Sequence, residues 1–357
     1  MRKRISLLMA LAVAVVPVPA SASDSSWQPQ SAAARGTFTA VTTGSDDAST
    51  AWAFGIGPHG RSFAVRTTGQ FAEEWMPAAV PDVGRVHHAA GRWAAGERGA
   101  LRWVDGAWRR VPFAGRPGAV TTVRAVEVDP LDGERAWAAG VETVPGTPWR
   151  RGVVQRWDGS HWQAVPVPTG LLDASSELTA VLPWVAGEVL AFGVDHDRSG
   201  DRVLVLRYDG RTWTRVPTPH RPGHDEHVAG YAPASARLVG WTAPVGAPPS
   251  ARRPLVYRVN PETRELVRER TPAVAAELTA VTTEYGTPLA VGHTAAGRPF
   301  AMHLTGDPEE GLWAADAMPD IRGKLLAVSG ILVPNIWAVG VASGPAGDRP
   351  LVLRNSP

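Results

Sequence analysis

The feature that most constrains this chain is a short apolar segment that ends in glycine and recurs seven times. Successive glycines are 41, 44, 53, 47, 52 and 48 residues apart. A period of this length indicates a supersecondary unit that cannot bury both of its faces alone, so several copies must stack. The seven glycines are Gly55, Gly96, Gly140, Gly193, Gly240, Gly292 and Gly340.

The third repeat shows the plan of one unit. Residues 123–126 alternate between apolar and polar, residues 136–140 are almost wholly apolar, and residues 153–157 form a third strand pattern. The pair Asp158-Gly159 predicts a type I′ hairpin turn, because both central residues of that turn need positive φ. Residues 162–166 then form a fourth strand. We name these strands A to D and predict a seven-bladed β-propeller of four-stranded antiparallel blades.

The two ends of the chain are expected to complete one blade. The seventh repeat stops after strand C, whereas Trp27 lies 11 residues before Phe38, the interval that separates Trp75 from Val86. Trp27 therefore occupies the position of a strand D tryptophan. We predict that residues 26–28 supply the last strand of the seventh blade, which closes the ring and removes the free edges of an open array.

The first residues have the pattern of an export signal. Residues 2–4 are basic, residues 5–16 are an apolar run too short to cross a bilayer, and residues 20–22 offer a small-residue cleavage site. We expect a signal peptide over residues 1–22 and a mature propeller over residues 23–357. The protein is then secreted and extracellular, without a membrane span.

The charge balance argues against a nucleic-acid partner. The chain has 36 Lys+Arg against 34 Asp+Glu, so loss of the three basic residues of the signal leaves a mature net charge of −1. A nucleic-acid-binding protein would show a basic stripe, and the sequence has none. Cysteine is absent, which excludes disulfides and thiol chemistry. We expect a monomer that binds a glycan, a peptide or a small molecule.

The turn between strands C and D resembles a repeat common in secreted actinobacterial proteins. Residues 157–166 read Trp-Asp-Gly-Ser-His-Trp-Gln-Ala-Val-Pro, close to the Trp-Asn-Gly-Thr-Ser-Trp turn and Val-Pro ending of those repeats. The resemblance covers nearly the whole mature chain and implies an architecture similar to kelch and galactose-oxidase-type propellers. It implies no shared activity, because the matching residues are structural. The Gly-Gly doublet of kelch repeats and the cysteine of galactose oxidase are both missing.

One histidine-rich stretch is a candidate metal site. Imidazoles and a carboxylate together suit zinc, copper or manganese, so a divalent metal is the cofactor that the sequence suggests. The stretch is expected to lie in the loop from strand D of the fourth blade to strand A of the fifth. Its spacing matches no known metal motif, and the alternative is a polar surface loop. The candidate ligands are His220, His224, Asp225 and His227.

Charged and aromatic residues also gather in the expected B–C loops. Alternate connections of an up-and-down sheet emerge on one side, so the B–C and D–A loops should share a face. Loops on a rigid scaffold commonly carry function. In a propeller, strand A lines the central channel, so either His87 or His88 could face a ligand there, and a core or channel histidine without a ligand is the alternative. The candidate ligand contacts on the shared face are Trp149, Arg151, His196, Trp241, Arg253 and Arg298.

These features favour binding over catalysis. The chain lacks a Gly-x-Ser-x-Gly elbow, a His-Glu-x-x-His motif and a phosphate loop. The leading interpretation is an extracellular recognition protein that binds a glycan, peptide or cell-envelope partner through the shared face. The alternative is a lyase or hydrolase, with or without a metal, that acts on a polysaccharide or natural product. A purely structural role is the third hypothesis.

Overall fold

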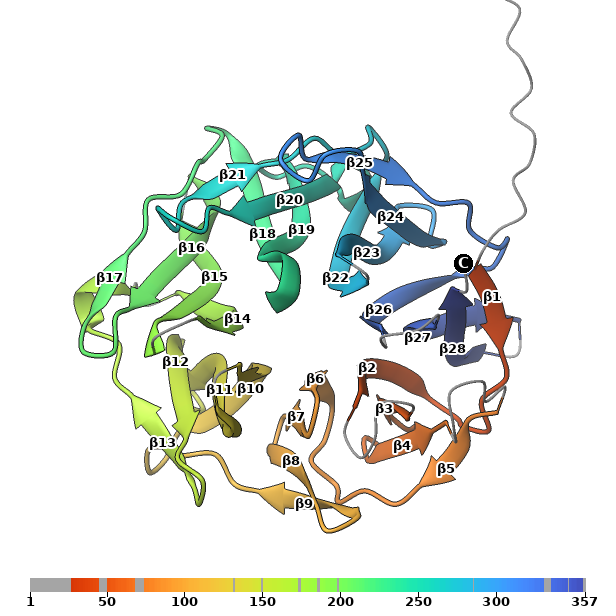
Figure 1. Cartoon of the computed structure of the whole chain (residues 1–357), viewed down its shortest axis with the longest axis horizontal. Coiled ribbons are helices and arrows are strands. Elements are labelled where there is room, and N and C mark those ends of the chain that lie inside the picture. Colours follow the sequence, from red (N-terminus) through yellow and green to blue (C-terminus); the bar gives the residue numbers. More distant parts are fainter. Residues whose placement is uncertain are drawn as a thin grey trace, which may run out of the picture.

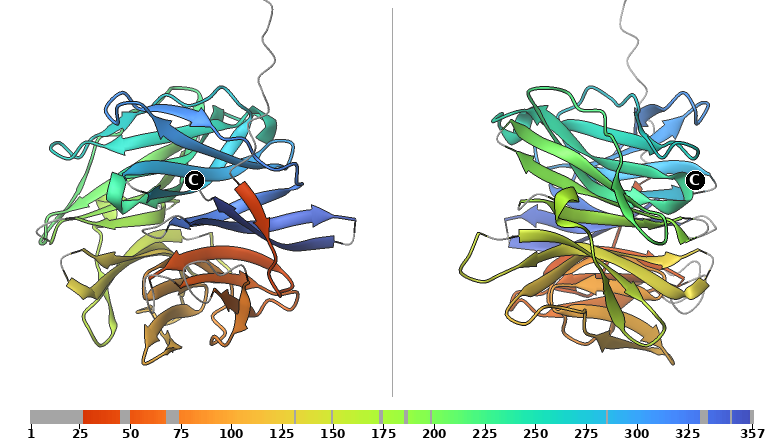
Figure 2. Two further views of the ribbon diagram at one scale, coloured as in Figure 1. Left: turned by 45° about the vertical axis from the view of Figure 1, so that its right-hand side comes forward. Right: turned by 90° about the vertical axis from the view of Figure 1, so that its left-hand side faces the viewer.

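The fold is a seven-bladed β-propeller, as the repeat predicts. Seven four-stranded antiparallel sheets form a ring around a central channel (Figure 1). Figure 2 shows the blades edge-on, stacked side by side. No described helix is long and apolar enough to cross a membrane. The computed structural model describes residues 27–44, 50–67, 74–130, 132–148, 150–172, 175–184, 187–197, 199–284, 286–330, 335–345 and 347–355, so the expected signal peptide lies outside it.

In blades 1 to 6 the strands follow the sequence from strand A at the channel to strand D at the rim (Figure 1). Blade 1 contains β2 (Thr37–Thr43), β3 (Ala51–Ile56), β4 (Ser62–Arg66) and β5 (Met76–Ala78). Blade 2 contains β6 (Val86–Ala90), β7 (Trp93–Gly96), β8 (Gly99–Val104) and β9 (Ala107–Val111). Blade 3 contains β10 (Val120–Asp129), β11 (Asp132–Thr143), β12 (Arg150–Trp157) and β13 (Trp162–Val165).

The next three blades repeat this order, with short 3-10 turns at η1 (Thr169–Leu171), η3 (Pro233–Ser235) and η4 (Pro249–Ala251). Blade 4 contains β14 (Glu177–Pro183), β15 (Val189–Asp197), β16 (Gly200–Tyr208) and β17 (Trp213–Arg215). Blade 5 contains β18 (His224–Ala232), β19 (Arg237–Pro244), β20 (Arg253–Val259) and β21 (Leu266–Arg268). Blade 6 contains β22 (Ala276–Glu284), β23 (Thr287–Thr294), β24 (Pro299–Thr305) and β25 (Leu312–Ala315).

Blade 7 is built from both ends of the chain, which confirms the predicted closure. Its outer strand β1 lies beside β28 (Figure 1). The pairing is antiparallel and places Trp27 opposite Asn355 and Gln30 opposite Val352. The four strands, from the channel outward, are β26 (Gly323–Gly330), β27 (Ile336–Gly344), β28 (Gly347–Asn355) and β1 (Trp27–Gln30).

The core lies between neighbouring blades, and the repeated tryptophans fill it. Trp108 in strand D of blade 2 meets Phe54 in strand B of blade 1 edge-on, with ring centres 5.1 Å apart. Trp162 of blade 3 meets Trp93 of blade 2 in the same way at 5.0 Å. Edge-to-face pairs of this kind contribute about 0.5–1.5 kcal/mol beyond the burial of their area. These tryptophans therefore have a structural role.

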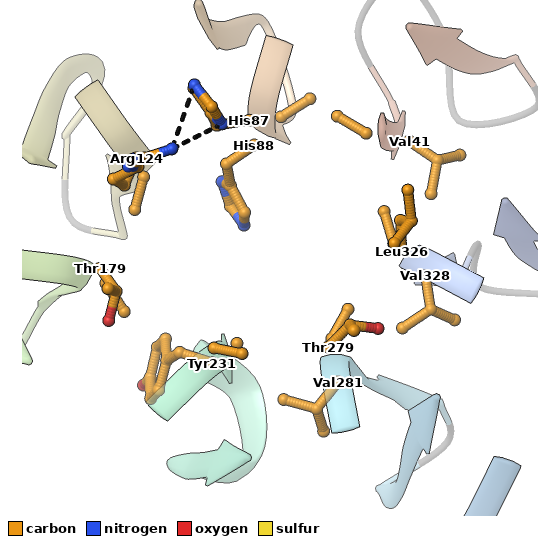
Figure 3. Close-up of a pocket in the computed structure, with 18 of the residues that line it drawn as sticks. Val41, His87, His88, Arg124, Thr179, Tyr231, Thr279, Val281, Leu326 and Val328 are labelled. Atoms are coloured by element: carbon orange, nitrogen blue, oxygen red, sulfur yellow. Dashed lines mark hydrogen bonds between the residues drawn. The ribbon is translucent and has the colours of Figure 1, made fainter. Parts of the chain in front are cut away.

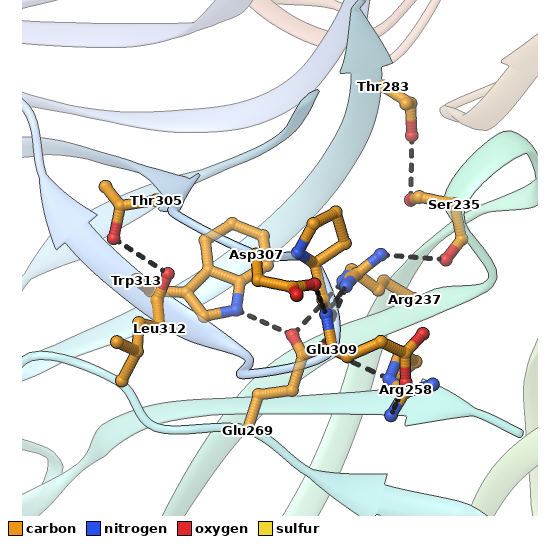
Figure 4. Close-up of polar contacts among 11 residues, drawn as sticks. Ser235, Arg237, Arg258, Glu269, Thr283, Thr305, Asp307, Glu309, Leu312 and Trp313 are labelled. Atoms are coloured by element: carbon orange, nitrogen blue, oxygen red, sulfur yellow. Dashed lines mark hydrogen bonds and ion pairs between the residues drawn. The ribbon is translucent and has the colours of Figure 1, made fainter. Parts of the chain in front are cut away.

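Buried charges join blade 5 to blade 6 near the rim (Figure 4). Arg237 and Glu269 are both buried, and Arg237 Nη2 lies 3.0 Å from Glu269 Oε1. The indole N–H of Trp313 donates to Glu269 at 2.7 Å, and Arg237 donates to the Pro308 carbonyl at 3.0 Å. Buried ions need such hydrogen bonds to offset their desolvation. Because these charges are matched, the network ties the blades together and offers no free group to a ligand.

A bulge in every strand A explains the repeated glycine. In all seven sheets the register between strands A and B shifts directly after the residue that faces the glycine. A Cβ added at Gly340 would lie 1.9 Å from the carbonyl oxygen of Lys324, and one at Gly240 would lie 1.8 Å from that of His227. A side chain does not fit at either position, so close backbone approach requires glycine there.

Replacing Gly340 with alanine is therefore expected to lower the free energy of unfolding by at least about 1–3 kcal/mol, the usual cost of overpacking. The obstructing atom belongs to the backbone and cannot move without breaking the sheet. Urea unfolding measures the effect. The matched control is Gly344→Ala in the same strand, where an added Cβ meets nothing within 4 Å. Equal midpoints for the two variants would contradict this explanation.

Candidate functional site

The B–C and D–A connections bring a continuous line of polar side chains together on what we call the D–A face. The line runs from blade 3 to blade 6, and we call it the ionic ladder. Its members belong to separate repeats but meet because the blades stack. They are Arg150, Glu177, His196, Asp201, His227, Trp241, Arg252, Glu277 and His293.

The ladder crosses the boundaries between these blades in one way. A residue at the B–C hairpin of one blade contacts a residue of strand A in the next blade. Within its own sheet, that strand A residue pairs with the strand B residue that directly follows the repeat glycine. Such cross-blade pairs hold the side chains in fixed positions. The pairs are Arg150–Glu177 at 3.1 Å, Asp201–His227 at 2.5 Å and Arg252–Glu277.

Within blades 4 and 5 the ladder continues through aromatic rings. His196 Nδ1 lies 2.9 Å from Asp201 Oδ1. The His227 ring stacks on Trp241 with centres 4.2 Å apart, and the Arg252 guanidinium lies 4.1 Å from the centre of the Trp241 ring. Burial lowers the pKa of His227, although the Asp201 carboxylate opposes this shift. We therefore expect His227 to be neutral at physiological pH.

At the blade 6 end, Glu277 is held strongly in its charged form. His293 Nε2 lies 2.6 Å from Glu277 Oε1, and Arg252 binds the other carboxylate oxygen. Hydrogen bonds from His293 and then Arg252 outweigh the effect of burial and lower the pKa of Glu277 to about 2. Glu277 is therefore a permanent anion at physiological pH.

A cavity of about 220 Å³ adjoins this end of the ladder, and we call it the blade 6 cavity. Its polar lining consists mainly of Arg252, Glu277, His293 and Lys324. Lys324 comes from strand A of blade 7, is exposed, and has no acidic partner within the described part of the chain. The cavity thus presents two cations, one carboxylate and one imidazole.

Some sequence-predicted residues meet in the ladder. His196, His227 and Trp241 are members, and Asp225 adjoins them because its carboxylate accepts the backbone N–H of Asp201 at 2.9 Å. Arg151 instead donates to the carbonyl of Val167. The remaining predicted contacts bind elsewhere or lie outside the described residues: Arg253 donates to the Ser250 carbonyl, Arg298 pairs with Asp320, and Trp149 is not described.

The histidine-rich stretch differs from the expected loop, because β18 already begins at His224. Successive side chains of a strand point to opposite faces, so His224 and His227 lie on opposite faces, whereas Asp225 lies on the same face as His227. His220 Nδ1 lies 3.6 Å from the buried Glu226, and the His224 ring lies 3.4 Å from the Pro222 carbonyl. Among the described residues, no group of three or more His, Cys, Asp or Glu could hold a metal ion. A metal site on this stretch stays a prediction.

The sequence reasoning missed Glu177, Glu277 and His293, although a signal was present. Arg150, Asp201 and Arg252 belong to the charged residues expected in the B–C loops. Glu177 and Glu277 occupy the strand A position that His227 has in blade 5. His293 follows its repeat glycine as Trp241 does. Aligning the repeats on the glycine therefore places an ionisable residue at this strand A position in blades 4 to 6, and Lys324 at the same position in blade 7.

No protein-family model matches this chain, and no curated protein matches it either. The fold and the site define a class of protein rather than a family. It is a propeller with a rigid, half-buried polar surface over blades 3 to 6 of the D–A face.

Proposed function

We propose that this protein is a secreted recognition protein whose D–A face binds an acidic glycan of an extracellular surface. The blade 6 cavity is the observation that carries the proposal. There the exposed Lys324 has no carboxylate partner in the described chain, and Arg252 and Glu277 line the same hollow. The export signal expected at residues 1–22 supports an extracellular location.

The chemistry of the cavity suits an acidic sugar. Sugar hydroxyls can donate to the Glu277 carboxylate and accept from Arg252, while a sugar carboxylate can pair with Lys324. Because the ladder already fixes Arg252 and Glu277, ligand binding has little side-chain entropy to remove. Preorganised polar groups of this kind give specificity to a small binding site.

The charge state of Glu277 favours binding over acid–base catalysis. A general acid or base works best with a pKa near the operating pH. The pKa of Glu277 is about 2, so this carboxylate neither donates nor retains a proton at neutral pH. It is suited to accept hydrogen bonds from a bound ligand.

Replacing Lys324 with glutamine is expected to weaken binding to polygalacturonate about tenfold or more, since hydrogen bonds to charged groups contribute about 1.5–3 kcal/mol. Affinity electrophoresis in gels containing polygalacturonate or neutral dextran measures this. The control, Arg109→Gln on the exposed rim strand β9, makes the same change in net charge. Equal retention of the two variants, or no retention of the parent, would refute the proposal. Shortening of the polysaccharide would instead indicate the lyase or hydrolase alternative.

A further inference from the structure

The central channel contains a cavity that the D–A face does not explain. Strand A of each blade lines it, and the narrow part measures about 70 Å³ (Figure 3). A wider cavity of about 250 Å³ continues from it. The wider part is lined by the C-terminal ends of strand A, including Thr43, Thr283 and Ser329. The channel is therefore open toward the face opposite the D–A face.

One wall of the channel contains an arginine without a counter-ion. Arg124 of β10 lies beside His87 of β6, with Nη1 3.2 Å from His87 Nδ1 (Figure 3). Within the described residues, no carboxylate forms an ion pair with Arg124. Burial, followed by the charges of Arg124 and Arg85, lowers the pKa of His87 to about 3. His87 is then neutral, and Arg124 is left as the one positive charge among the described residues that line the narrow cavity.

The other polar groups of this wall do not neutralise Arg124. Glu127 also lines the narrow cavity, but burial raises its pKa to about 8, so it is mostly protonated at neutral pH. The Tyr231 hydroxyl is buried and has no hydrogen-bond partner within the described structure. An unpaired charge and an unpaired hydroxyl are both costly away from bulk water. The cost at Arg124 falls when a ligand with anionic oxygens enters the channel.

The opposite wall is apolar. Val41 of β2, Val281 of β22 and Leu326 and Val328 of β26 face the channel across from Arg124 (Figure 3). Such a surface favours hydrocarbon, because burying apolar area is favourable in proportion to that area. The channel therefore combines one cationic point with a hydrocarbon-binding wall.

We propose that the channel binds a small aliphatic monocarboxylate, with its carboxylate at Arg124 and its chain against Val41, Leu326 and Val328. A guanidinium matches a carboxylate in planar, two-point geometry. The single positive charge matches a monoanion, whereas a phosphate dianion would bring a second charge that the neutral His87 cannot balance. The narrow part has room for roughly five water-sized volumes. The remainder of the ligand then occupies the wider mouth.

Calorimetric titration of the full chain at pH 7 with hexanoate, 1-hexanol, hexylamine and inorganic phosphate tests the ligand class. We expect hexanoate to bind and the other three to bind at least tenfold more weakly. From butanoate to hexanoate, affinity should rise about fourfold per methylene group. Hexanol binding as tightly as hexanoate, preference for phosphate, or no heat with any acid would each overturn the proposal.

Two substitutions locate the site. Arg124→Gln should weaken hexanoate binding at least tenfold. Leu326→Ala should weaken hexanoate binding severalfold, and this variant should still bind hexanoate more tightly than hexanol. Melting curves confirm that each variant is folded. The rim variant Arg109→Gln should bind like the parent, and so should Lys324→Gln, because Lys324 lies at the other end of strand A. Hexanoate binding that survives Arg124→Gln would place the ligand elsewhere and refute the assignment.

Discussion

Replacing Trp27 with alanine should lower the free energy of unfolding by about 3–5 kcal/mol, the usual cost of truncating a buried tryptophan. Trp27 is 1% exposed and belongs to a cluster with Leu289, Leu325 and Leu353. Its indole N–H also donates to Asp316 at 2.9 Å. The change therefore leaves a cavity where the two ends of the chain meet, and it removes one hydrogen bond from the Asp316 carboxylate, which keeps its contact with His303.

Differential scanning calorimetry measures this effect. For a chain of this length, 3–5 kcal/mol corresponds to a melting temperature lower by roughly 4–7 °C. Gln28→Ala is the matched control, because Gln28 is the next residue of β1 and its side chain is exposed. It should melt within about 1 °C of the parent. A Trp27→Ala protein that melts with the parent would show that β1 contributes nothing to closure.

Replacing Glu127 with glutamine should stabilise the protein at alkaline pH. Burial raises the pKa of Glu127 from 4.5 to about 8. Between these values the unfolded chain has lost the proton and the native protein keeps it, so native stability falls as pH rises through the interval. A shift of this size corresponds to about 5 kcal/mol at most. Water in the adjoining cavities reduces the cost of burying the charged carboxylate. Above pH 8 we therefore expect the free energy of unfolding of Glu127→Gln to rise relative to that of the parent by about 2–5 kcal/mol.

The measurement is the difference in urea unfolding free energy between variant and parent at pH 5, 7 and 9. His88 lies 3.7 Å from Glu127, and Tyr231, His87 and Arg124 line the same cavity. Burial lowers the pKa of His88 to about 4, so the histidines destabilise the protein toward acid pH and their contribution largely cancels in the difference. The exposed variant Glu262→Gln should show no pH-dependent gain. A Glu127→Gln gain that is constant with pH would contradict the prediction.

These two predictions concern different levels of the structure. The effect at Trp27 arises from packing and strand pairing, which the repeat already implies. The effect at Glu127 arises from burial of one carboxyl group in a channel, and it bears on ligand binding. While Glu127 is protonated, Arg124 remains the net charge of the channel, so loss of the Glu127 proton should also weaken the binding of an anion.

The fold could be predicted because its determinants are local and repeated. The type I′ turn predicted at Asp158-Gly159 is wrong, because only Gly159 has positive φ and a four-residue loop joins Trp157 to Trp162. The same Asp-Gly pair in blade 2 does form a two-residue turn, with φ of 50° at Asp105 and 76° at Gly106. Gly340 and its equivalents mark strand B in every repeat, at the residue that faces the bulge of strand A. Once seven such units were recognised, the missing strand D of the seventh blade could be assigned to the segment that contains Trp27. Each inference depended on residues a few positions apart, or on comparison of one repeat with another.

The candidate sites could be predicted only in part. His196, His227 and Trp241 lie together on the face that the B–C and D–A loops were predicted to share, because alternate connections of a sheet emerge on one side. The histidine-rich stretch was expected as a loop, but its second half is strand, so alternation separates His224 from His227. Residues three positions apart can approach each other in a loop, whereas in a strand their side chains point to opposite faces.

The amino-acid sequence by itself determined the number of blades, the strand order within each blade and the residue that completes the ring. Only the tertiary structure decided which ionisable groups become neighbours and which are left alone. Arg124 and Glu127 are three residues apart in one strand, yet the first lies against a neutral imidazole and the second is buried as an acid. Strand patterns follow from covalent neighbours, whereas charge states follow from distances and burial between blades, which exist only after the blades have stacked.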